Sequence, residues 1–229
     1  MNISLTLIKI LSVVSILIIS SFMILSFLNA HQYDYSSRVA SIDPETASKM
    51  LKETLNDIYF TNEQNYIKIL NLGGLSINIQ KTAFNFSIGL PNETLSWILN
   101  LYMLCLSNIC EYSQNDLYSI NSQPIREINT TIIATLNIEV NKTGLENITI
   151  YNFYVSILNF NFTGKITGEN SIRIESQKNA VTLTRIFQLG FMLSFYINGS
   201  TIYSLKINDR SIINFYLIGI KVNLIQQAV

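Results

Sequence analysis

An unbroken apolar run near the N-terminus is the first pattern along the chain. Residues 10–28 contain no charged side chain, and no polar face recurs in them at helical spacing. As a helix, this run spans about 28 Å, close to the ~30 Å hydrocarbon core of a bilayer. Lys9 precedes the run and acidic residues follow it, so the positive-inside bias places the N-terminus in the cytoplasm. We therefore expect residues 1–30 to be a single-pass transmembrane signal anchor in the cell membrane, with the lipid bilayer as its partner and the C-terminal domain extracytoplasmic.

Cleavage of this segment as a signal peptide is the alternative. Ala30 suits the last position before a cut, but Leu28, two residues earlier, breaks the usual small-x-small pattern. The apolar run is also longer than the ~7–15 residues of a typical signal peptide. These two departures favour an anchor that is retained.

A helical pattern follows a short polar spacer. Asp43 suits an N-cap, Pro44 the first helical position and Glu45 the positive end of the helix dipole. Residues 31–61 are thus predicted to hold a juxtamembrane spacer and an amphipathic helix over 44–60. We expect its apolar stripe to pack on the following domain; the alternative, lying on the lipid surface, normally requires more basic residues. The stripe consists of Ala47, Met50, Leu51, Leu55 and Ile58.

From Ile67 onward, the period of the pattern changes from 3.6 to 2. Short stretches alternate apolar and polar residues and are separated by Asn, Gly and Ser, which is typical of a β-sandwich. The fold class is therefore predicted as mainly β, with an immunoglobulin-like β-sandwich after the helices. The run 95–106 fits both the helical and the alternating template. The alternating stretches are Ile67–Ile69, Leu75–Ile79, Phe84–Ile88, Ile138–Val140, Tyr151–Val155, Ile172–Ile174 and Ile218–Val222.

A weak internal repeat points to two related β units. A shift of 52 residues without gaps places Phe84–Ile88 on Leu136–Val140. Under this interpretation, residues 62–130 form a first β unit and residues 131–229 form a second. Trp97–Leu106, within the ambiguous run, is then a strand like Ile150–Leu158. Asn-rich strands also match by chance, so a single sandwich stays open.

The second unit carries a family resemblance. The stretch from Leu136 to Gly144 combines an alternating strand with a turn, and a small-residue turn at Thr163-Gly164 lies between the strands that follow. In this order of features the unit resembles the late embryogenesis abundant type 2 family (the water stress and hypersensitive response domain), which has Pro where this chain has Lys142. The resemblance implies a seven-stranded immunoglobulin-like sandwich without a catalytic site, and a role associated with desiccation and stress. The strands that follow Gly144 are Ile148–Phe160, Ile172–Glu175 and Val181–Ile186.

Composition and charge narrow the function classes. Charged residues make up 13% of the chain, against ~25% in an average soluble protein. Basic and acidic residues number 15 each and do not cluster, so the sequence lacks the basic stripe that binding to nucleic acid requires. His31, at the membrane exit, is the only histidine, and no phosphate loop, nucleophile elbow or metalloprotease motif occurs. We therefore predict no catalytic residues, no metal site, no cofactor and no nucleic-acid partner.

Two kinds of covalent site remain. Cys105 and Cys110 are the only cysteines, and their spacing suits a disulfide at a hairpin end outside the cytoplasm; two small buried apolar residues are the alternative. Asn-x-Ser/Thr sequons are frequent after the anchor, and they are possible glycan acceptors where they lie in turns. Asn85, inside a strand pattern, is the poorest of them. The glycosylation candidates are Asn141, Asn147 and Asn198 at predicted turns, followed by Asn92, Asn129 and Asn161.

These patterns predict a glycoprotein with a non-catalytic binding, structural or protective role and an unidentified protein or surface partner. The alternative is a filament subunit that resembles type IV pilins, with an N-terminal apolar helix and a glycosylated β head. Lys9 before the apolar run, with Leu11 and Ser12 following, is similar to a prepilin processing site, although Ile10 replaces the expected small residue. N-terminal sequencing separates the two, because a pilin starts near residue 10 or 11. A membrane-tethered enzyme is a third class, and it requires a site assembled from distant residues.

Overall fold

The computed structural model describes residues 42–61, 63, 65–107, 110–145, 147–167, 171–208 and 210–227. The predicted anchor, the spacer before residue 42 and His31 lie outside these residues. Within the described part of the chain, no helix is long and apolar enough to cross a membrane. The described residues all belong to one compact unit.

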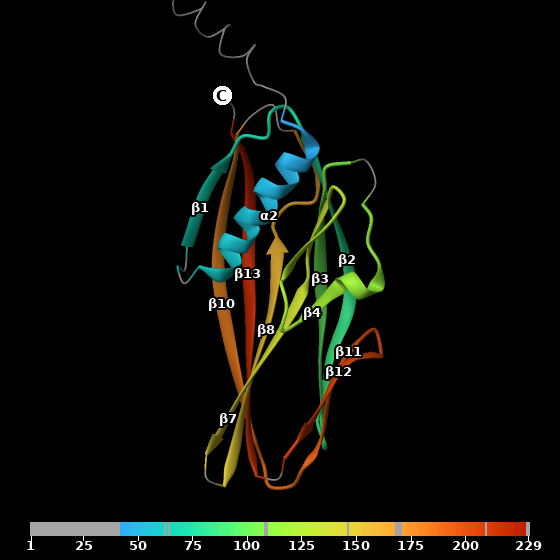
Figure 1. The fold of residues 1–229 in the computed structure, drawn as a ribbon, viewed down its shortest axis with the longest axis vertical. Helices are drawn as coiled ribbons and strands as arrows, with labels where there is room; N and C mark the ends of the chain where they lie inside the picture. Colours follow the sequence, from blue (N-terminus) through green and yellow to red (C-terminus); the bar gives the residue numbers. More distant parts are fainter. Residues whose placement is uncertain are drawn as a thin grey trace, which may run out of the picture. The chain divides into compact units, whose positions relative to one another are not determined.

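The helix predicted after the spacer is present as α2 (Pro44–Phe60). The Asp43 carboxylate caps it by accepting a hydrogen bond from the Thr46 backbone N–H at 2.9 Å, and Pro44 occupies the first turn. Its apolar stripe, including fully buried Leu55, packs against strands of both sheets. In Figure 1, α2 lies across the upper part of β10, β13 and β8. The expectation that the stripe packs on the β body is confirmed.

Two β-sheets make up the rest of the body, which confirms the mainly β prediction. The first sheet has the order β1-β10-β13-β8-β7-β4; the second has the order β12-β11-β2-β3-β6-β5, with β9 paired to β2. Both sheets combine strands from residues 62–130 and 131–229, so the two ranges form one body. The first sheet contains β1 (Asn65–Leu70), β4 (Tyr118–Ile120), β7 (Leu136–Leu145), β8 (Ile148–Phe160), β10 (Ser171–Phe187) and β13 (Ser211–Gln227). The second contains β2 (Ser76–Gly89), β3 (Thr94–Cys105), β5 (Ile125–Ile128), β6 (Thr131–Ala134), β9 (Gly164–Thr167), β11 (Phe191–Ile197) and β12 (Ser200–Ile207), and a short 3-10 helix, η1 (Gln114–Leu117), precedes β4.

One long, bent hairpin runs through both sheets. Its arms pair antiparallel as β10 with β13 in the first sheet and as β11 with β12 in the second. Phe187 pairs with Ser211 and Phe191 with Ile207, so the register is the same on both sides of the bend. The tip is Asn198–Gly199, with φ of 49° and 81°, as its sequence predicts for a two-residue turn. Parallel pairing of β13 with β8 joins this hairpin to the rest of the first sheet.

Two hydrophobic cores lie on opposite faces of the strands. Along β3, Leu101, Met103 and Cys105 belong to one core, and Tyr102 and Leu104 belong to the other. Successive side chains of a strand point to opposite faces, so this end of β3 is buried on both faces. A strand buried on both faces has a continuous apolar run, which is why this segment also fitted a helical template. We call the core that contains α2 the helix core, and the other, rich in Phe rings, the aromatic core.

Two expectations about turns and strands are wrong. The predicted turn at Asn141–Gly144 is part of β7, because β7 stays paired with β8 up to Leu145. The turn lies beyond Leu145, at the level of Asn147. Ile172–Glu175 and Val181–Ile186 are not two strands but parts of β10, which pairs with β13 without a break. Polar residues from Ser176 to Asn179 separate the two stretches, but they lie within a paired strand and not in a turn.

The strand pairs that contain the two repeated stretches differ in their turns. Strands β2 and β3 pair up to Gly89 and Thr94, with four residues between them. Strands β7 and β8 pair up to Leu145 and Ile148, with two residues between them. A gapless shift of 52 residues therefore does not superpose the two pairings.

Candidate functional site

One face of the first sheet is covered by α2 at one end and open at the other. Along β13, Ile220, Val222 and Leu224 face the helix core. The same face continues toward the start of β13 through Tyr216 and Asn214, which are partly exposed. We call this part the open face. Its residues, in register across four strands, are Thr182, Thr184 and Ile186 of β10, Ile212, Asn214 and Tyr216 of β13, Ile150, Asn152 and Tyr154 of β8, and Glu139, Asn141 and Thr143 of β7.

A row of polar side chains crosses the open face. The Thr184 hydroxyl donates to Asn214 Oδ1 at 2.8 Å, and Asn214 Nδ2 donates to Asn152 Oδ1 at 2.9 Å. Asn141 is the cross-strand partner of Asn152 at the end of this row. Beside the row, the rings of Tyr154 and Tyr216 stack with centroids 4.7 Å apart and planes at 11°. The face thus presents neutral amide, hydroxyl and aromatic groups in a fixed order.

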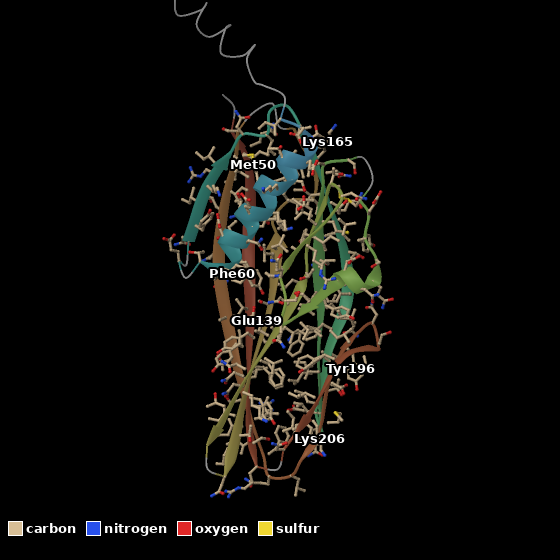
Figure 2. The ribbon with its side chains drawn as sticks, in the orientation of Figure 1. Met50, Phe60, Glu139, Lys165, Tyr196 and Lys206 are labelled. Carbon is tan, nitrogen blue, oxygen red and sulfur yellow. A yellow bond between two sulfur atoms is a disulfide. The ribbon has the colours of Figure 1, made fainter. Side chains whose placement is uncertain are left out.

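A hollow of about 450 Å³ lies where the open face meets the end of α2. Its walls come from three places: Phe60 at the last turn of α2, the loop 121–123 between β4 and β5, and the adjoining strands β7 and β8. Figure 2 shows Phe60 at the lower end of α2 and Glu139 close below it. The hollow is open to solvent rather than enclosed, and the described residues form other surface hollows of comparable or larger volume.

The loop 121–123 is fixed to β7 by Asn121. This residue has a left-handed backbone, with φ of 47°, which Asn tolerates better than most residues. Its backbone N–H donates to the Ile138 carbonyl at 2.9 Å, and its Oδ1 accepts a bond from the Val140 N–H at 2.8 Å. The loop therefore continues the pairing of β4 with β7 and holds one wall of the hollow in place.

A series of buried, hydrogen-bonded polar side chains leads to Glu139; we call it the buried polar chain. The Ser119 hydroxyl donates to Asn137 Oδ1 at 2.6 Å and lies 3.0 Å from the Thr135 hydroxyl, which donates to the Pro124 carbonyl at 2.7 Å. Asn137 Nδ2 then donates to Glu139 Oε1 at 2.9 Å. Ser119, Thr135 and Asn137 are at most 1% exposed, so their hydrogen bonds replace those to water. The chain orients the Glu139 carboxylate at the hollow.

Lys178 fixes the end of α2. Its Nζ donates to the Tyr59 carbonyl at 2.9 Å and to the Thr61 carbonyl, and these are groups that a helix C-terminus leaves unpaired. Burial lowers the pKa of the Lys178 ammonium below its ordinary range. The contacts explain why Phe60 is held at a defined place although its side chain is 62% exposed.

The cysteines lie apart from this hollow. The structure joins Cys105 and Cys110 in a disulfide with Cα atoms 5.3 Å apart, at the end of β3. Neither cysteine lines the hollow. The bond links β3 to the segment that leads to β4, and no chemistry at the open face follows from it.

The sequon asparagines are spread over the surface. All six glycosylation candidates are exposed, and so is Asn85 on β2. Asn141, predicted at a turn, lies instead within β7 and lines the hollow. The other five lie in turns or loops between strands: Asn92, Asn129, Asn147, Asn161 and Asn198.

Sequence reasoning missed the residues that form the hollow. Phe60, Gln123 and Tyr154 are far apart in the chain, and no local motif connects them. One signal lies at the start of β7, where Thr135, just before the strand, and Asn137, Glu139, Asn141 and Thr143 within it form an alternating polar face. The opposite face begins with the apolar residues Leu136, Ile138 and Val140. Such a polar face on an interior strand indicates a polar network or a bound ligand.

The lining of the hollow supplies hydrogen-bonding groups and ring faces that can contact a ligand. No group of three or more His, Cys, Asp or Glu side chains in the described residues is placed to hold a metal ion. Glu139 lines the hollow together with the hydroxyl-bearing residues Ser122 and Tyr154. The predicted histidine, His31, lies outside the described residues.

Comparisons with known proteins give no guide to this site. No protein-family model matches the chain, and no curated protein or solved structure matches it. The function is therefore argued from the site itself.

Proposed function

We propose that the chain is a single-pass membrane protein whose β body lies outside the cytoplasm and binds a partner without catalysing a reaction. The open face, with its hollow, is the observation that carries the binding role. A sheet face normally buries its side chains against another layer. Here α2 covers one end of the face, while the other end keeps an ordered row of amide and aromatic side chains at the surface.

The topology rests on the apolar run at residues 10–28 and on Lys9 before it. The sequons fit an outer location, because all six candidates are exposed. We also assign the body to the immunoglobulin-like sandwich class, with a resemblance to the late embryogenesis abundant type 2 family over residues 131–229. The two-sheet, mainly β body is the observation behind this assignment. It departs from the expectation of seven strands in all, because the two sheets hold six and seven strands.

Membrane fractionation tests the anchor. The full chain should stay in the membrane pellet after high-salt and carbonate extraction, because an inserted apolar helix is held by hydrocarbon rather than by charge. A variant that lacks residues 1–30 should move to the soluble fraction. Finding the intact protein free in the cytosol would contradict the proposal.

A filament subunit is the second candidate, and one observation favours it. β1 pairs with β10 only as far as Gln177, and among the described strands none pairs with that edge from Lys178 to Phe187. An unpaired strand edge is a template for pairing with another chain. Filaments in electron micrographs of the native protein, together with a mature N-terminus near residue 10 or 11, would favour this candidate. A mature N-terminus at residue 1 would exclude processing of the prepilin type.

A further inference from the structure

We propose that the hollow at the end of α2 binds a neutral saccharide carried by another molecule. This inference rests on the binding role proposed above and names its ligand class. The hollow combines two aromatic rings with several uncharged groups that both donate and accept hydrogen bonds. Sugars present the matching chemistry: hydroxyl groups around the ring edge and apolar C–H groups on the ring faces.

The uncharged polar groups come from both walls. Asn121 and Gln123 belong to the loop 121–123, and Asn141 belongs to β7. The amides of Gln123 and Asn141 each carry two N–H donors and a carbonyl acceptor, and Asn121, whose Oδ1 accepts from the Val140 N–H, adds its N–H donors. Together they pair with hydroxyl groups of either orientation. Glu139 adds one carboxylate acceptor, which its bond from Asn137 orients.

The aromatic groups form the apolar side of the hollow. Phe60 is 62% exposed, and it follows the buried stripe of α2 without joining the helix core. Tyr154 is held by stacking on Tyr216 at 4.7 Å. Phe60 and Tyr154 therefore offer ring surface at the rim of the hollow, against which apolar C–H groups of a ligand can pack.

Other ligand classes fit this hollow poorly. Phosphate and other anions are bound by Arg, Lys or helix N-termini, but neither Lys nor Arg lines the hollow, and the helix end that reaches it is a C-terminus. An acyl chain requires a mostly apolar lining, whereas five of the eight lining residues are Asn, Ser, Gln or Glu. An extended peptide remains as the competitor, because amide side chains also pair with a peptide backbone.

The hollow is already formed, which lowers the entropy cost of binding. Asn121 is fixed by two hydrogen bonds to β7, Glu139 by the buried polar chain, and the end of α2 by Lys178. Binding therefore does not require the walls to reorganise.

The test uses the full chain, made in a host without N-glycosylation and purified in a detergent that has no sugar head group. The protein is applied to a printed array of neutral oligosaccharides, acidic oligosaccharides and unglycosylated peptides, and each hit is measured by titration calorimetry. We expect binding to a neutral oligosaccharide, and a loss of affinity of about tenfold or more in Phe60→Ala and in Gln123→Ala. The matched control is Tyr112→Ala, because Tyr112 is a 45% exposed ring outside the hollow; its affinity should stay within about twofold of the parent.

Several results would overturn the inference. One is the absence of any saccharide binding tighter than about 1 mM. Others are binding that Phe60→Ala and Gln123→Ala leave unchanged, and binding of an array peptide that both variants abolish. The unglycosylated protein could bind a saccharide while the protein from its own host does not. That result would show that the hollow holds the protein's own glycan on Asn141 instead of a saccharide carried by another molecule. Circular dichroism of each variant checks that it is folded. In all these cases the proposal of a membrane-anchored body is tested separately, by whether the protein stays in the membrane pellet.

Discussion

Replacing Leu55 with alanine tests whether α2 is an integral part of the β body. Leu55 is fully buried in the helix core, where it packs among residues from both sheets. Leu→Ala substitutions at such sites cost about 2–5 kcal/mol, because apolar contacts are lost and a cavity remains. With an m-value of about 2 kcal/mol per M of urea, the unfolding midpoint should fall by about 1–2.5 M.

The readout for this variant lies in the other core. Trp97 is the only tryptophan, and it stacks on Phe86 of the aromatic core with centroids 5.9 Å apart. Its fluorescence, followed in urea on the full chain in detergent micelles, should report the destabilisation if both cores unfold together. Glu53→Ala is the control, since Glu53 is exposed on the same helix and its loss should change the free energy of unfolding by about 0.5 kcal/mol or less. If neither the Trp97 transition nor the loss of far-UV circular dichroism shifts in Leu55→Ala, the packing of α2 on the body is refuted and a helix on the lipid surface is favoured.

Three further outcomes follow from the structure. Gly199→Ala should lower the free energy of unfolding by about 1–2 kcal/mol because of its φ of 81°, whereas Gly219→Ala, at an ordinary φ with equally open surroundings, should change little in the same urea titration. The hydrogen bond and charge of Arg185 hold the pKa of Glu93 below its ordinary value, so stability from this pair is present above pH 4.5 and is lost as the pH falls through the lowered pKa. As the pH is lowered, the urea midpoint of Glu93→Gln should therefore fall less than that of the parent protein. An equal fall in both proteins would contradict the pairing. On protein from its own host, glycosidase treatment and peptide mapping should find glycans at the turn sequons and none at the sequon within β7, because a transferase reaches a turn more easily than a paired strand. The control is a known surface glycoprotein from that host. A glycan on β7 would contradict this reasoning.

Local signals predicted the parts of the fold that local chemistry determines. Asp43 and Pro44 mark the start of α2 because capping depends on neighbouring residues alone. Asn198–Gly199 marks the hairpin tip for the same reason, since a two-residue turn needs two residues that accept positive φ. These elements lie where the sequence placed them.

Long-range pairing was beyond the sequence patterns. Alternation shows which residues share a face, but not which strand lies beside which, so β10 was divided into two strands and the turn before β8 was placed too early. The alternation also does not reveal that the strands change from one core to the other along their length. The hollow depends on both of these properties, because Phe60, Gln123 and Tyr154 meet only through the packing of α2 and the pairing of β4, β7 and β8.

Labelling of intact cells tests the outer location of the β body most directly. The chain's two cysteines are joined in a disulfide, so a single new cysteine can be labelled selectively. Lys206→Cys places a thiol at an exposed position of β12, and Asn2→Cys places one before the predicted anchor. A membrane-impermeant maleimide should label Lys206→Cys on intact cells and Asn2→Cys only after lysis. Labelling of Lys206→Cys only after lysis would place the body in the cytoplasm and contradict the account.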